Sequence, residues 1–169
     1  MNEKRGLLVA IDGSPAAEDA IKYVGTMMAG QPSVEVHLLH VLPPMPPRLR
    51  EHGGASSATE EQALGAKLEL ERNDWEREQI SHSQPLFEQA EFVLAEAGLA
   101  TSMMEEECRL ATDSEQLSEI CLKTARNAGC NTLVVGRESF SWLGERWHQH
   151  LCHEIVRRGE GFAVWVVCT

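Results

Sequence analysis

The fold is decided by the stretch GLLVAIDGSP at residues 6–15. Its first six residues are continuously apolar, which is typical of a strand that helices cover on both faces. Asp12-Gly13 then favours a turn, and Ser14-Pro15 supplies a good helix N-cap and a good first helical residue. Apolar residues recur at helical spacing over 17–28. This stretch therefore predicts a strand, a tight turn and a helix.

The alternation of strand and helix continues to the end of the chain. Strands are expected at 6–11, 34–42, 102–110, 131–136 and 162–168, and helices at 15–28, 59–81, 85–97, 117–128 and 148–158. A capping box at 112–115 precedes the fourth of these helices. Right-handed connections between such elements predict a doubly wound, mostly parallel five-stranded sheet with helices on both faces, an α/β fold.

Residues 1–169 are expected to form one domain, because single cores of this size are common. An insertion at about 43–82 interrupts the pattern. Its first part is rich in Pro, Gly and Ser and predicts a mobile loop at 43–57. The dense charges from Glu60 to Glu78 fit either a solvated helix face or, with Trp75, an arm that docks a partner.

Composition excludes several classes of function. A net charge of −11 repels polyphosphate, so binding to DNA or RNA is not expected. No apolar run is long enough to cross a bilayer, and the charged N-terminus is unlike a secretion signal, so we expect a cytoplasmic protein without membrane contact. The five cysteines lack CxxC spacing and are interpreted as small buried residues with one exposed thiol.

A ligand site is expected where the strands end. Open parallel sheets bind ligands at the carboxyl ends of their strands, where the strand order reverses. The loops after Ile11, Val41 and Gly136 are the candidates. Asp12 at the first of these ends could hold a ribose or a metal ion, or could simply form the turn.

The residues together resemble the universal stress proteins. The resemblance rests on VAIDGS at 9–14, on a second strand ending LHV at 39–41, and on LVVGR at 133–137 followed by a terminal Val-rich strand. It implies a Rossmann-like domain, usually a homodimer, that either binds ATP or has lost that ability. Asp12 and Val41 match positions that hold the nucleoside in members of the family.

The glycine motif of the family's nucleotide-binding branch, G-x2-G-x9-G-(S/T), is degraded here. Gly136 matches its first glycine, but Ser139, Gln149 and His150 replace the other three elements. Each side chain in place of a glycine occupies space that the phosphates need. We therefore expect no bound cofactor, with ATP and Mg²⁺ at Asp12, Val41, Gly136 and Ser139 as the alternative.

The expected function is a stress-response binding and regulatory module, and not an enzyme. It would be a homodimer through the C-terminal strand at 162–168, because pairing with a second copy covers an open edge, and it would act through protein partners not yet known. The alternative is an adenine-nucleotide switch or slow ATPase. A metal-dependent enzyme built on His148, His150 and Cys152 is a third hypothesis, but histidines at 148, 150 and 153 point in different directions around a helix.

Overall fold

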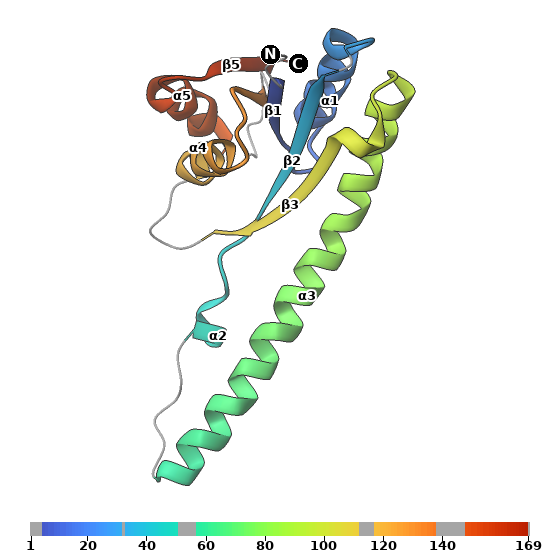
Figure 1. The fold of residues 1–169 in the computed structure, drawn as a ribbon. Helices are drawn as coiled ribbons and strands as arrows, with labels where there is room; N and C mark the ends of the chain where they lie inside the picture. Colours follow the sequence, from blue (N-terminus) through green and yellow to red (C-terminus); the bar gives the residue numbers. More distant parts are fainter. Residues whose placement is uncertain (1–4, 32, 51–56, 112–116, 138–147, 169) are drawn as a thin grey trace.

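Five parallel strands form the sheet of the computed structural model, in the order β3-β2-β1-β4-β5 (Figure 1). The strands are β1 (Arg5–Ala10), β2 (Val34–Leu42), β3 (Met104–Leu110), β4 (Thr132–Arg137) and β5 (Ala163–Cys168). The predicted α/β class and the parallel five-stranded sheet are confirmed. The structure describes residues 5–31, 33–50, 57–111, 117–137 and 148–168.

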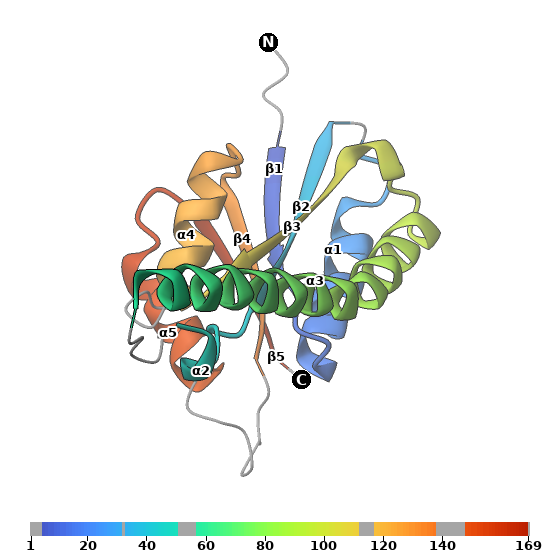
Figure 2. The same ribbon diagram turned by 90° about the horizontal axis from the view of Figure 1, so that it is seen from below.

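Two helical layers enclose the sheet (Figure 2). Helix α1 (Pro15–Met28) and the second half of α3 (Ala58–Glu96) cover one face, and α4 (Leu117–Asn127) and α5 (His148–Arg158) cover the other. We call these the α1/α3 face and the α4/α5 face. A 3-10 turn, η1 (Thr101–Met103), precedes β3. Each face has its own apolar cluster, so burial on both sides explains the continuous apolar run that begins the chain.

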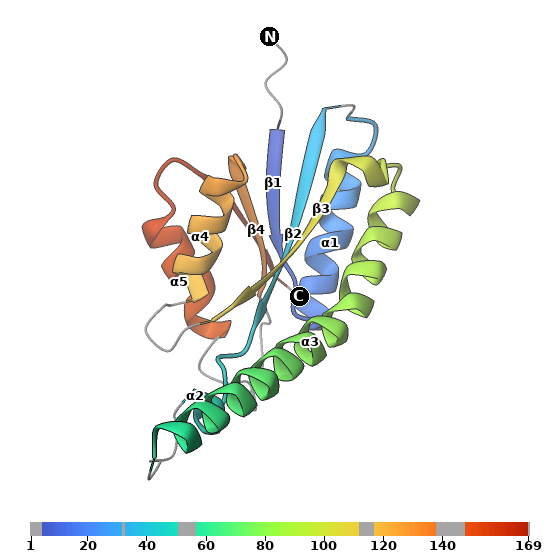
Figure 3. The same ribbon diagram turned by 60° about the horizontal axis from the view of Figure 1, so that its bottom comes forward.

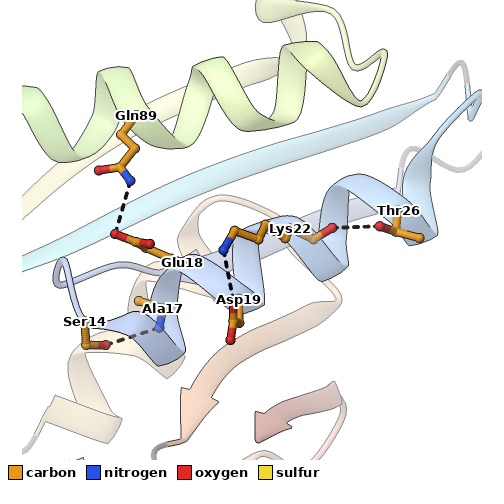
Figure 4. A network of polar contacts seen from close by, with 7 residues as sticks. All are labelled: Ser14, Ala17, Glu18, Asp19, Lys22, Thr26 and Gln89. Carbon is orange, nitrogen blue, oxygen red and sulfur yellow. Dashed lines mark hydrogen bonds and ion pairs between the residues drawn. The ribbon is translucent and has the colours of Figure 1, made fainter. Parts of the chain in front are cut away.

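Helix α1 begins as its sequence predicts. The Ser14 hydroxyl accepts a hydrogen bond from the Ala17 N–H at 3.2 Å, and Pro15 is the first helical residue. On the outer surface of α1, the amide of Gln89 in α3 donates to the Glu18 carboxylate at 3.1 Å (Figure 4). The two helices of this face are thus joined by a polar contact at the surface as well as by the core beneath.

The expectation of two separate helices at 59–81 and 85–97 is wrong. Helix α3 runs without a break from Ala58 to Glu96 and contains Pro85. A proline inside a helix removes one N–H donor and costs about 3 kcal/mol. Just beyond it, Phe87, Ala90 and Leu94 are buried against the sheet, and their burial outweighs that cost.

The first half of α3 extends past the carboxyl ends of the strands (Figures 1 and 3). A short helix, α2 (Pro47–Arg50), packs against it there, and Leu49 and Leu68 are both buried. The Arg72 guanidinium donates to the carbonyls of Leu49 and Arg50. The prediction of a loop is therefore wrong at 47–50, because α3 supplies an apolar and hydrogen-bonding surface that the sequence pattern does not reveal.

The remaining predicted elements lie within a residue or two of their expected positions, as at β2 and α5. The capping box at 112–115 lies outside the described residues. In the described part of the chain, no helix combines the length and the apolar character that a membrane span requires.

Candidate functional site

A cavity of about 710 Å³ lies at the carboxyl ends of the central strands. The three predicted loop positions meet around it, since Ile11, Val41 and Gly136 all belong to its wall. Most of the other lining side chains are apolar and come from four strand ends and from α1, α4 and α5: Ala10, Ala17, Leu39, Leu42, Pro43, Pro44, Ala111, Leu117, Cys121, Val135 and Leu151. Asp12, Ser14 and His40 are the polar residues of the described wall.

Asp12 belongs to the cavity wall and also forms the turn after β1. Its Oδ1 accepts a hydrogen bond from the Ser14 N–H at 2.9 Å, the geometry of an Asx turn. Gly13 within this turn has φ +78°, and Leu86 of α3 would lie 2.9 Å from an added Cβ. The two interpretations of Asp12 are therefore compatible, because a carboxylate that forms the turn also lines the cavity.

His40 is a cavity residue that sequence reasoning did not select. Its Nδ1 lies 2.8 Å from the carbonyl oxygen of Ile11. A carbonyl can only accept a hydrogen bond, so Nδ1 carries a proton and the neutral ring keeps Nε2 as an acceptor. The available signal was its position between Leu39 and Val41 at the end of a strand, where open sheets bind ligands.

Gly136 touches the backbone of α1. A Cβ on this residue would lie 2.2 Å from the carbonyl oxygen of Ala16 and 2.7 Å from the backbone nitrogen of Ala17. No side chain fits there unless the helix moves. Packing of α1 on β4 is therefore enough to require the first glycine of the motif, and its presence is not evidence for phosphate binding.

The other motif positions do not add to the described wall. Ser139 lies outside the described residues, as do the side chains of Gln149 and His150. The role of Ser139 in the alternative nucleotide site therefore stays a prediction, whereas Asp12, Val41 and Gly136 do share one cavity.

Charge in the described wall is of one sign. Asp12 is acidic, and no lysine or arginine is among the described lining residues. A polyanion would meet the Asp12 carboxylate there, whereas a neutral ligand with apolar surface and hydrogen-bond donors would suit this wall.

The cavity thiol is not a nucleophile. Burial raises the pKa of Cys121 to about 12, so the thiol is protonated at neutral pH. Among the described residues, no group of three His, Cys, Asp or Glu side chains is placed to bind a metal ion. Cys152 faces the core and His153 faces solvent, and the side chains of His148 and His150 lie outside the description.

Sequence reasoning missed several residues of the cavity wall. Pro43-Pro44 follows β2 and was assigned to the loop, although a proline pair directly after a strand end was a usable signal. Leu117 and Cys121 were predicted only as the buried side of a helix, because nothing local distinguishes a cavity wall from a core.

Comparison with solved structures supports the fold. A universal stress protein family member from Burkholderia pseudomallei is 15% identical, with a TM-score of 0.56 over 99% of this chain and 98% of that chain. The universal stress protein from Archaeoglobus fulgidus in complex with dAMP is 15% identical, with a TM-score of 0.55 over 99% of both chains. A family protein from Arabidopsis thaliana with AMP bound is 13% identical, with a TM-score of 0.58 over 97% of this chain and 91% of that chain.

Sequence comparison identifies the family. A search of curated proteins finds no match. The family model described as the universal stress protein family matches residues 5–160, which is nearly the whole chain. The similar fold of the solved structures agrees with this identification. The chain belongs to the universal stress protein family.

Proposed function

We propose that this protein is a homodimeric binding module that holds a small, uncharged ligand of nucleoside type and does not bind ATP strongly. The observation that carries the proposal is the cavity wall, which in its described part contains one carboxylate and no lysine or arginine. Triphosphate carries several negative charges and needs cations or free backbone N–H groups around it. A nucleoside needs neither.

Adenine nucleotides are the probes that the similar structures suggest. Two of them are structures of proteins with AMP or dAMP bound. This favours a nucleotide switch as the second candidate function. In that case the purified protein would retain a nucleotide, which heat release and chromatography would detect.

Isothermal titration with adenosine, AMP and Mg-ATP separates the two candidates. We expect adenosine to bind at least about tenfold more tightly than Mg-ATP, a difference of about 1.4 kcal/mol that repulsion between the triphosphate and the Asp12 carboxylate can produce. Micromolar binding of Mg-ATP would contradict the proposal and support the switch.

The Asp12→Asn variant tests the charge argument. Its amide oxygen can still accept the Ser14 N–H, so the turn is kept. The preference for adenosine over Mg-ATP should narrow in this variant. Asp19→Asn is the matched control, because Asp19 lies on α1 in an exposed ion pair with Lys22 and is not among the cavity residues (Figure 4). An equal effect of both substitutions would mean that net charge, and not the site, sets the preference.

The proposed dimer forms through β5. This strand is at the edge of the sheet, and Val164, Trp165, Val166 and Val167 are only half-buried. An open edge with apolar side chains favours pairing with another strand. Tyr23 of α1 extends the apolar surface, since it is 42% exposed and meets Trp165 edge to face at 5.8 Å between ring centroids.

Light scattering at micromolar concentration should give the mass of two chains. Val166→Lys should shift it to one chain, because a charge on an edge strand opposes edge-to-edge pairing. Val156→Lys is the control, since this residue is 61% exposed and belongs to α5 and not to the edge strand. A one-chain mass for the unmodified protein would exclude the dimer.

We propose that the module acts by binding and through protein partners, without catalytic residues of its own. The protonated state of the cavity thiol supports this view. We also propose the cytoplasm as its compartment, where the five cysteines, all free in the structure, would stay reduced.

A further inference from the structure

Two thiols and one guanidinium lie on the same face of the sheet, at the carboxyl ends of β4 and β5. Cys168 ends β5 and lies in register with Arg137, which ends β4. Side chains alternate along a strand, so both project to the α4/α5 face. Cys152 packs in the cluster of that face from α5, with its Sγ 3.7 Å from the carbonyl oxygen of Gly136. Strand register, side-chain alternation and helix packing thus place the three groups together.

We propose that Cys152 and Cys168 form a redox pair that closes to a disulfide within one chain when the protein meets a peroxide. The proposal does not depend on the ligand that the cavity holds. The two thiols differ as such a pair requires, because Cys168 is exposed and Cys152 is buried. The exposed thiol can meet the oxidant, and the buried one can resolve the product.

The reaction balances with a peroxide as the oxidant. The Cys168 thiolate attacks one peroxide oxygen, the O–O bond breaks, and a sulfenic acid forms as hydroxide leaves. The Cys152 thiolate then attacks the sulfenic sulfur, the S–S bond forms, and the S–O bond breaks. Two thiols and one peroxide give one disulfide and two waters when the peroxide is hydrogen peroxide, with two electrons passing from sulfur to oxygen.

The other cysteines are poor competitors. Burial raises the pKa of Cys121 to about 12 and that of Cys130 to about 11, so both stay protonated and covered. Cys108 lies on β3 at the opposite edge of the sheet. Burial also raises the pKa of Cys152, and so does the charge of Cys168, whereas the Arg137 guanidinium lowers it. Among these neighbours, Arg137 is the group that favours the resolving thiolate.

A disulfide between Cys152 and Cys168 would link the wall of the ligand cavity to the edge strand of the proposed dimer. Cys152 directly follows Leu151, a residue of the cavity wall, and Cys168 ends the strand of the proposed dimer. A disulfide would fix α5 to the end of that strand. Oxidation would thereby act on the ligand cavity and on the dimer edge at once.

Treatment of the intact protein with hydrogen peroxide tests the pair. Digestion without reductant followed by mass spectrometry should yield the Cys152 peptide linked to the Cys168 peptide, and the intact single-chain mass should fall by two hydrogens. Thioredoxin or dithiothreitol should reverse both changes. A link between two chains, a link to Cys108, or a Cys168 sulfinic acid beside a free Cys152 would overturn the proposal.

Three variants complete the test. Cys168→Ser changes an exposed residue and should abolish the link without loss of the fold. Cys108→Ser is the matched control and should leave the link intact. Arg137→Gln should slow disulfide closure by a larger factor than the first oxidation of Cys168, which dimedone labelling measures. Unchanged closure in Arg137→Gln would exclude the role of the guanidinium, and a persistent link in Cys168→Ser would exclude the pair.

Discussion

Replacement of Gly136 by alanine is expected to lower the free energy of unfolding by about 3 kcal/mol or more, because overpacking against rigid backbone costs more than against a mobile side chain. The added Cβ would lie 2.2 Å from the carbonyl oxygen of Ala16 and 2.3 Å from its carbonyl carbon. Helix α1 would have to move away from β4 and uncover part of the core between them. Urea denaturation followed by circular dichroism measures the loss.

Gly30→Ala is the matched control for this substitution. Gly30 follows α1 with φ +74°, and nothing lies within 4 Å of an added Cβ. The Gly30→Ala variant therefore has the conformational cost of alanine at positive φ, about 1 kcal/mol, without any clash. If Gly136→Ala cost no more than Gly30→Ala, the contact with α1 would not require glycine, and a ligand role for Gly136 would regain support.

The glycine shows why a motif match alone is weak evidence. In sequence, Gly136 can be explained equally by a phosphate cradle and by close packing. Only the position of the Ala16 carbonyl distinguishes them, and that position results from how α1 lies on the sheet. The departures from the glycine motif at Ser139, Gln149 and His150 could be recognised in the sequence, because the motif requires glycine or a hydroxyl residue at these positions.

The fold itself was largely predictable, for a local reason. The central strands β1 and β4 lie between two helical layers and carry continuous apolar runs, and the helices that cover them carry apolar stripes, so both patterns are present in the sequence. Residues 34–42 form a strand as predicted. The errors lie at Pro85 and at 47–50, where tertiary contacts with the core and with Arg72 override local preference.

The cavity was predictable in place but not in composition. The strand ends at Ile11, Val41 and Gly136 could be named, since the topology of a parallel sheet brings them together. The side chains that α4 and α5 contribute to the cavity wall could not be named from the sequence. Whether Leu117 or Cys121 faces a cavity or a packed core depends on distances between helices, which leave no trace in a periodic apolar pattern.

The long helix α3 has two parts that are stabilised differently. Beyond Pro85 it is anchored to the sheet, and Leu94 there has no exposed surface. Before Pro85 it extends past the strand ends, with α2 as a packing partner, and Leu70 there is 63% exposed. Both halves of α3 are helical, but they contribute differently to the global stability of the protein.

Leu94→Ala should therefore lower the free energy of unfolding by about 3 kcal/mol, the usual cost of truncating a fully buried leucine. Leu70→Ala, the same substitution in the same helix, should change it by less than about 0.5 kcal/mol, as is typical of an exposed position. Denaturant titration measures both values. Because intrinsic helix propensity changes equally in the two variants, the difference between them measures the tertiary packing of the two side chains. Equal losses would mean that Leu70 is packed as firmly as Leu94, which would contradict its exposed position on the first half of α3.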